Sequence, residues 1–201
     1  MLLERRFFLA AAVIGLGASS FPAVAAITKH SNVVPPRLMN KALAAVTKHR
    51  ANILHGDVIA IVDFGTASSR ARFYLVNLVG GHTTSMLVAH GKGSDPSDTG
   101  WLQSFSNAPG SNASSQGSFL TGQPYVGKHG QSRRLLGLDP ENNLALDRAI
   151  VIHAASYVSD DMIKRFSKIG RSQGCFAVSE DYIRQVLDRL GPGRLLFADK
   201  G

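Results

Sequence analysis

Two stretches of the chain lie close together in sequence: Arg-Ala-Ile-Val-Ile-His at residues 148–153 and Gly-Arg-Ser-Gln-Gly-Cys-Phe at residues 170–176. The first is an apolar run without glycine or proline, which predicts a buried strand ending at His153. The second contains Cys175, the only cysteine in the 201-residue chain. A thiol is a stronger nucleophile when a histidine can take its proton, so this pair indicates a cysteine nucleophile and its base. A buried structural cysteine beside an unrelated histidine is the alternative.

The N-terminus has the pattern of an export signal. Residues 1–6 form a short basic segment, residues 7–18 are apolar but too short to span a bilayer comfortably, and Ala-Val-Ala at 23–25 suits a signal peptidase. We therefore expect a signal peptide over residues 1–25, with Arg5 and Arg6 resembling the twin-arginine type. An uncleaved membrane anchor is the alternative, and we expect no membrane span after cleavage. Exported proteins usually pair their cysteines, so a lone Cys175 favours a reactive thiol.

The remaining chain has the size of one globular domain. We expect an N-terminal lead-in and helix over residues 26–56 and a catalytic domain over residues 57–201. The formal charge is +8 at pH 7. Outside the cytoplasm such a surface suits anionic partners, either cell-wall polymers or lipid head groups, although a solvated basic surface without a partner is equally consistent. The compartment and the lack of a recognisable binding module argue against nucleic acid as a partner.

The hydrophobic patterns predict a mainly β domain with helical decoration, of the α+β class. Strands are expected over residues 58–64, 72–78, 84–89, 117–125, 133–138, 148–153 and 194–198. Residues 91–117 are rich in Gly, Ser, Asn, Asp and Pro, which is typical of a long functional or disordered loop. Trp101 and Phe105 are expected to anchor it against the core, and a mobile lid over the site is the alternative.

Three helices are expected. The first opens at Pro35-Pro36, the second begins after Ser159, and the third is capped by Ser179. Their apolar positions predict which residues face inward: Leu38, Met39, Ala42, Leu43 and Val46 in the first, Met162, Ile163 and Phe166 in the second, and Ile183, Val186, Leu187 and Leu190 in the third.

The residues around the cysteine indicate how it would act. Gly174 permits a close backbone approach, and its amide together with that of Cys175 would stabilise an oxyanion. The order of histidine before cysteine differs from papain-like proteases, and the caspase signature is absent. Spacing alone leaves both the catalytic and the structural interpretation open.

The pattern of His153, an eighteen-residue gap and Ser172-Gln173-Gly174-Cys175 resembles the signature of the L,D-transpeptidases, a histidine followed by Ser/Thr-x-Gly-Cys. The chain departs from the common pattern at Gln173, Phe176 and Ala177, which concerns the contacts with the donor peptide. Blocks similar to the murein L,D-transpeptidase catalytic domain lie at residues 105–107, 114–117, 125–130, 137–138, 148–155 and 170–175.

The resemblance implies an L,D-transpeptidase-like β-sandwich or barrel and a two-step acyl transfer on peptidoglycan stem peptides, which serve as donor and acceptor. Cys175 would form a thioester with the third residue of the stem and release D-alanine. His153 would act as acid and base, with a backbone carbonyl in residues 154–156 fixing its tautomer. No metal or organic cofactor is implied. The alternatives are an L,D-carboxypeptidase or endopeptidase and a non-catalytic wall-binding module.

Further polar residues are candidates with less distinctive patterns. Ser172 would shape the turn or join the hydrogen-bond network, and Arg171 would bind a substrate carboxylate unless it is a solvated loop residue. Gln173 is a candidate substrate contact, while Lys128 and His129 are expected at the surface or substrate rim and not in catalysis. The histidines His30, His49, His55, His82 and His90 lack metal-ligand spacing. Ser106, Asn107 and Ser115 would line the donor groove or form turns.

Overall fold

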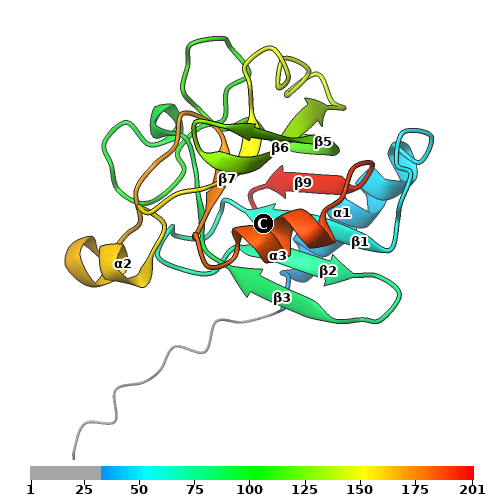
Figure 1. Ribbon diagram of the computed structural model, residues 1–201, viewed down its shortest axis with the longest axis horizontal. Coiled ribbons are helices and arrows are strands. Elements are labelled where there is room, and N and C mark those ends of the chain that lie inside the picture. The colour runs from blue at the N-terminus through cyan, green and yellow to red at the C-terminus, as the bar shows by residue number, and fades with distance from the viewer. Residues whose placement is uncertain (1–32) are drawn as a thin grey trace, which may run out of the picture.

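The computed structural model describes residues 33–201, so the expected signal peptide lies outside the described residues. Within residues 33–201, nine strands form one open, mixed sheet in the order β3-β2-β1-β9-β5-β6-β7-β8-β4 (Figure 1). Three α-helices and one short 3-10 helix accompany them. The expected mainly β fold with helical decoration is confirmed. None of the described helices has the length and apolarity needed to cross a membrane.

The elements follow one another along the chain with few long gaps. They are α1 (Pro36–Lys48), β1 (Val58–Asp63), β2 (Phe73–Asn77), β3 (Thr83–Met86), β4 (Val88–Ala89), η1 (Lys92–Ser94), β5 (Gly117–Gly127), β6 (Gly130–Gly137), β7 (Val151–Ala154), α2 (Asp160–Phe166), β8 (Phe176–Val178), α3 (Ile183–Arg189) and β9 (Leu195–Asp199).

The sheet curls because its two edge strands are consecutive in the chain. β3 pairs with β2 at one edge and β4 pairs with β8 at the other, yet only Leu87 separates β3 from β4. The two edges must therefore approach each other, and in Figure 1 β5 and β6 lie above β1 and β2. The sandwich or barrel implied by the resemblance takes the form of this single curled sheet. The strand expected over residues 84–89 is consequently divided between both edges.

Alternate residues of β1 explain why the whole strand is buried. Ala60 and Val62 face the main core inside the curled sheet. Ile59 and Ile61 face outward and pack against Leu38 of α1, in a second apolar cluster that also contains Ala42 and Ala45. β1 is covered on both faces, so it reads as a continuous apolar run instead of an alternating one.

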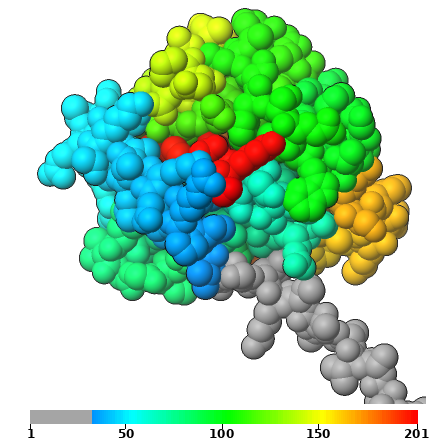
Figure 2. All heavy atoms as spheres, turned by 180° about the vertical axis from the view of Figure 1, so that it is seen from behind, coloured from blue at the N-terminus to red at the C-terminus, as the bar shows by residue number. Residues whose placement is uncertain are grey.

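The side of the molecule that carries α1 also carries the C-terminus. Figure 2 shows the last residues between α1 and the segment that precedes β5. Lys41 Nζ lies 2.6 Å from Asp199 Oδ2, and Lys200 Nζ donates to the carbonyl of Gln103 at 2.9 Å. α1 is thus joined to the sheet by packing and by an ion pair.

Two residues that the helix patterns predict to face inward are exposed in the structure. Leu43 is 41% exposed because the buried stripe of α1 runs through Leu38, Ala42 and Ala45 instead. Phe166 is 57% exposed at the end of the short α2. Ser159 caps α2 as expected, accepting a hydrogen bond from the Met162 amide.

The third helix begins later than the sequence pattern indicates. α3 starts at Ile183, with Tyr182 at the capping position and no side-chain cap. Ser179 instead accepts from the Asp181 amide in the turn that comes before. The prediction that Val186 and Leu187 face inward is confirmed, since both are buried.

The long segment between β4 and β5 is organised around one buried carboxylate. Asp95 is fully buried and accepts hydrogen bonds from the amides of Thr99 and Gly100 and from the side chain of Gln103. Phe105 packs against the main core, but Trp101 is 53% exposed, so its expected anchoring role is wrong. Polar residues of the loop satisfy its backbone internally, which lets a long irregular segment pack against the domain.

Candidate active site

Two neighbouring parallel strands bring the candidate nucleophile and base together. β7 and β8 pair with His153 opposite Ala177 and Ile152 opposite Phe176, so Cys175 sits just before β8, beside β7. Both side chains line one cleft of about 480 Å³. The cleft is also lined by residues that come from β5 and the β5–β6 turn, from the segment before β7, from the turn after β7 and from the segment before β8: Tyr125, Lys128, His129, Asp147, Arg148, Ala149, Tyr157, Arg171, Ser172 and Gln173.

The tautomer of His153 is set by its neighbour. Nδ1 lies 2.8 Å from the carbonyl oxygen of Ala154. A carbonyl only accepts, so Nδ1 carries the proton and Nε2 is the basic nitrogen. Burial lowers the pKa of His153 most, the bond to Ala154 opposes this, and His129 and Lys128 lower it further. The imidazole is therefore neutral in the resting site, as a general base must be.

The Cys175 thiol is also neutral at rest. Burial raises its pKa, against the opposing effects of the Val151 amide, Lys128 and Arg148. Its Sγ lies 3.7 Å from the carbonyl oxygen of Ala149, which fits a weak thiol hydrogen bond. The raised pKa of the thiol and the lowered pKa of the imidazole both favour the neutral forms of Cys175 and His153.

The turn before Cys175 is held by Ser172. Its hydroxyl accepts from the Gly174 amide at 3.1 Å and donates to the Cys175 carbonyl at 2.7 Å. The Gly174 amide is therefore engaged by Ser172 in this structure, and its expected role as an oxyanion donor stays a prediction. Gly174 adopts φ +111°, and a Cβ there would lie 2.7 Å from the Ala113 carbonyl oxygen. Only glycine fits this backbone and this space.

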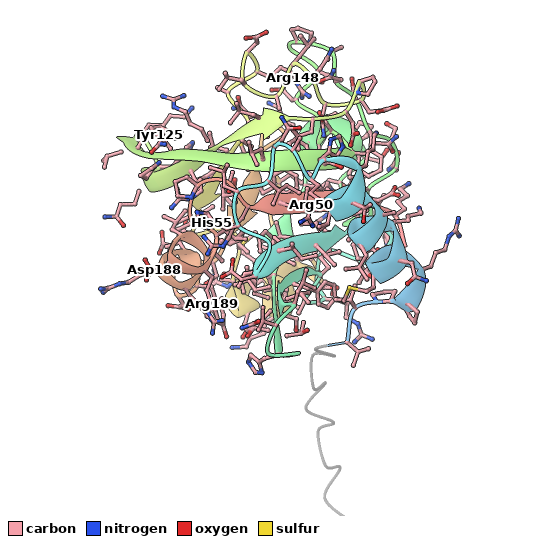
Figure 3. The ribbon with its side chains drawn as sticks, turned by 90° about the vertical axis from the view of Figure 1, so that its right-hand side faces the viewer. Arg50, His55, Tyr125, Arg148, Asp188 and Arg189 are labelled. Atoms are coloured by element: carbon pink, nitrogen blue, oxygen red, sulfur yellow. The ribbon has the colours of Figure 1, made fainter. Side chains whose placement is uncertain are left out.

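Arg148 was not identified as a functional residue from the sequence. Its Nη1 donates to the Ser106 carbonyl at 2.9 Å and to Ser115 Oγ at 2.6 Å, and its Nη2 donates to the Ala113 carbonyl at 2.6 Å. The guanidinium thus holds the end of the long loop beside the site. Figure 3 labels Arg148. Its block of sequence was noted, but as a strand, and its partners are two backbone carbonyls and two serine hydroxyls distant in the chain.

The three residues expected in the donor groove lie elsewhere. Ser106 and Ser115 bind Arg148 and each other, since Ser115 Oγ donates to the Ser106 carbonyl at 3.0 Å. Asn107 Nδ2 donates to Asn143 Oδ1 at 2.7 Å. None of the three lines the cleft. They hold the loop in this structure, and their expected contact with a donor peptide stays a prediction.

Arg171 and Gln173 both line the cleft, with different surroundings. Arg171 Nε lies 3.1 Å from Asp98 Oδ1, and its Nη1 donates to the Asp95 carbonyl. These contacts tie the Cys175 segment to the long loop, so the guanidinium is already engaged and is not a free carboxylate ligand. Gln173 is exposed in the cleft wall.

The turn between β5 and β6 lies against His153. Gly127 pairs with Gly130, so Lys128 and His129 form the tip of this hairpin. The His129 ring stacks on the His153 ring with centroids 4.1 Å apart and planes 21° apart. Of the two residues expected at a rim, His129 therefore contacts the candidate base itself, while Lys128 lines the same cleft.

A buried polar chain supports the site from behind. Arg72 is fully buried, and its Nη2 lies 2.7 Å from His90 Nδ1, while His90 Nε2 lies 3.3 Å from Asp95 Oδ2. The His90 carbonyl accepts from the Ser172 amide at 2.9 Å. This chain fixes the backbone beside the Cys175 turn. Among residues 33–201, no group of three or more His, Cys, Asp or Glu side chains is arranged to hold a metal ion.

A family model described as an L,D-transpeptidase catalytic domain matches residues 30–198. The chain belongs to this family. The matched range of the L,D-transpeptidase domain includes α1 and all of the sheet except Asp199, the last residue of β9. No match was found among curated proteins.

Solved L,D-transpeptidases are similar to this domain at low identity. One from Mycobacterium smegmatis has a TM-score of 0.45 and 12% identity, covering 71% of this chain and 58% of that one. L,D-transpeptidase 3 from Mycobacterium tuberculosis has a TM-score of 0.44 and 10% identity, with 72% and 61% covered. The helical cell shape determining protein Pgp2 from Campylobacter jejuni gives 0.43 and 13%, with 83% and 57% covered. The chain thus spans under two thirds of the length of each.

Proposed function

We propose that this protein is an exported cysteine L,D-transpeptidase that cross-links peptidoglycan stem peptides, with Cys175 as nucleophile and His153 as acid and base. The observation that supports this proposal most directly is that the thiol and the imidazole line the same cleft, with Nδ1 of His153 hydrogen-bonded to the Ala154 carbonyl. That contact leaves Nε2 free to take a proton. The family match supports the enzyme class.

In the acylation step, Nε2 of His153 takes the proton of the Cys175 thiol while sulfur bonds to the carbonyl carbon of the third stem residue. The Cys175 amide, the remaining donor of the turn, stabilises the oxyanion. The C–N bond to the terminal D-alanine then breaks, and His153 returns its proton to the leaving amine. A thioester and free D-alanine result.

In the second step, an amine of a neighbouring stem attacks the thioester carbonyl. His153 accepts a proton from this amine, the C–S bond breaks, and the proton passes to the Cys175 sulfur. The products are a new amide cross-link and the original thiol. An amine held in the cleft has a high effective molarity relative to water, which favours transfer over hydrolysis.

Export is part of the proposal because the substrate lies outside the cytoplasm. It is supported by the basic, apolar and small-residue segments over residues 1–25. Cleavage there would release a domain that begins shortly before α1. The domain would then act in the periplasm or cell envelope.

The experiment is a digest of peptidoglycan rich in tetrapeptide stems after treatment with the purified protein. We expect new cross-linked dimers, with some trimmed tripeptide as a side product. Tripeptide alone, in the presence of excess acceptor, would assign the protein as an L,D-carboxypeptidase acting through the same thioester. No change in the digest, from a folded protein with a reduced thiol, would favour a wall-binding module instead.

A further inference from the structure

His129, at the tip of the β5–β6 hairpin, contacts the site through its ring alone. It lies in the two-residue turn between the paired Gly127 and Gly130, where its side chain is exposed. Its ring makes no hydrogen bond or ion pair with any residue between 33 and 201. It stacks instead on the ring of His153, with centroids 4.1 Å apart and planes 21° apart. The hairpin therefore reaches the base with the face of a ring and not with a hydrogen bond.

The stacked ring covers one face of the base. His153 lines the cleft, yet only 2% of its surface is exposed, whereas His129 is exposed. Burial is also the largest influence on the pKa of His153, which it lowers. His129 thus lies on the solvent side of His153 and separates part of the base from water.

His153 has no carboxylate partner that would hold its ring. Among the described residues, its one hydrogen bond joins Nδ1 to the Ala154 carbonyl. Asp147 is the only carboxylate that lines the cleft, and it does not bond to His153. A single hydrogen bond in the plane of a ring leaves the ring able to tilt about that contact. A second ring packed on its face opposes the tilt, and stacked aromatic pairs contribute free energy beyond the area they bury.

The charges on the two rings suit this arrangement. Burial and then Lys128 lower the pKa of His129, and burial lowers that of His153 most. Both effects favour two neutral rings in the resting site. When Nε2 of His153 takes the thiol proton, its ring becomes a cation against the face of a neutral ring. The face of a neutral aromatic ring attracts a cation.

The same geometry excludes His129 as a proton relay to His153. The N–H group and the lone pair of an imidazole lie in the plane of the ring, so two rings stacked face to face do not hydrogen-bond each other. His129 can therefore act on His153 only through packing and through the field of its ring.

We propose that His129 is a positioning residue for the base, whose ring fixes the plane of the His153 ring and stabilises the imidazolium formed during acylation. This rests on the proposed function, because acylation of Cys175 is the step in which His153 becomes charged. The proton moves from Sγ of Cys175 to Nε2 of His153 and then to the leaving amine, and His129 neither gains nor loses one. The role requires an aromatic face at position 129 and no titratable group.

The test compares His129→Leu with His129→Phe. Leucine keeps apolar volume without an aromatic face, while phenylalanine keeps a ring that can stack and cannot titrate. The rate of acylation by a tetrapeptide donor is followed by intact mass over a range of donor concentrations. We expect His129→Leu to lower the maximal rate about tenfold and to leave the donor concentration at half that rate unchanged. His129→Phe should keep the maximal rate within about threefold of the natural protein.

The matched control is His82, an exposed histidine in the turn between β2 and β3, outside the cleft. His82→Leu makes the same change and should alter neither quantity. A donor-binding role for His129 would give another pattern, in which the donor concentration at half the maximal rate rises and phenylalanine does not restore it. That pattern, or an unchanged maximal rate in His129→Leu, would overturn the inference.

A second readout is independent of the peptide chemistry. A stacked ring shifts the NMR resonances of the carbon-bound protons of the ring it covers upfield. In protein labelled at its histidines, the His153 resonances are identified by their absence in His153→Gln. We expect them to move downfield in His129→Leu and to stay upfield in His129→Phe and His82→Leu.

The two readouts separate this inference from the proposed function. If the donor does not acylate the natural protein, the proposed function fails, while the His153 resonances still test the stack. Resonances that stay in place in His129→Leu would refute the stack itself, whatever the acylation rates.

Discussion

The Nδ1 atom of His153 lies 2.8 Å from the carbonyl oxygen of Ala154, the residue that follows it in β7. This contact places the proton on Nδ1 and the basic lone pair on Nε2 without the help of a carboxylate. A backbone carbonyl carries no full charge, so it orients the ring while burial keeps the pKa of His153 low. The resulting base is neutral and suited to a thiol that is itself protonated at rest.

Replacing the base should separate acylation from simple thiol reactivity. We expect His153→Ala to slow acylation by a tetrapeptide donor by about 10²- to 10⁴-fold, because general acid–base catalysis is lost. Alkylation by iodoacetamide at high pH should persist, since it needs only the thiolate. Intact mass measures both reactions. Acylation at the natural rate in His153→Ala would show that another group is the base.

The thiol should lack the low pKa of an ion-paired cysteine. Burial raises the pKa of Cys175 above its ordinary value, so the thiolate becomes populated only at higher pH than for an exposed cysteine. The rate of alkylation by iodoacetamide should therefore keep rising through neutral pH without reaching a plateau. A plateau with a midpoint below pH 7 would indicate a thiolate–imidazolium pair instead.

Gly174 should not tolerate a side chain. A Cβ would meet the Ala113 carbonyl at 2.7 Å, at a backbone φ of +111°. We expect Gly174→Ala to cost about 2–4 kcal/mol of unfolding free energy and most of the acylation rate. Gly81→Ala is the matched control, because Gly81 has φ +65° and nothing within 4 Å of the added atom. It should cost only about 1 kcal/mol. Chemical denaturation measures both, and equal losses would contradict the proposed clash.

The buried chain behind the site should make stability depend on pH. Burial lowers the pKa of His90 to about 4, and Arg72 and Arg171 add to this against the effect of Asp95. The unfolded histidine titrates near about 6.5, so the unfolded state binds more protons between these values. The contribution of His90 to the free energy of unfolding is fully present above about pH 6.5. It falls by about 3 kcal/mol as the pH drops towards 4.

His90→Asn removes this titration while keeping an acceptor for Arg72. Its unfolding free energy should be lower than that of the natural protein near neutral pH but should depend less on pH between 6.5 and 4. Denaturation at several pH values tests this. The same slope in both proteins would mean that His90 does not control acid stability.

The sequence predicted the elements that depend on local patterns better than the contacts between distant segments. The apolar run before His153 does contain a strand, but β7 begins only at Val151, because Ala149 has φ +53° and belongs to the preceding turn. The proximity of His153 and Cys175 follows from two short parallel strands. Of these, β8 was not expected, since a three-residue strand has too few positions to show a period.

The contacts missed from the sequence join residues far apart in the chain. Arg148 donates to two backbone carbonyls of the long loop, which any residue type could supply, and to two serine hydroxyls far away in the chain. His129 reaches His153 only because the β5–β6 hairpin folds back over the sheet. Ser106, Asn107 and Ser115 resembled groove residues by composition, yet their hydrogen bonds point to the loop and its anchor. The contacts of these residues depend on the direction of each side chain and not on its residue type.

The most direct measurement is the intact mass of the protein after incubation with a tetrapeptide donor and no acceptor, together with the D-alanine released. We expect an adduct equal to the tripeptide less water, one equivalent of D-alanine, and loss of the adduct when Cys175 is replaced by Ala. Chymotryptic mapping should locate the adduct on the peptide that contains Cys175. A folded, reduced protein that alkylates with iodoacetamide at Cys175 yet gains no tripeptide and releases no D-alanine would contradict the proposed thioester.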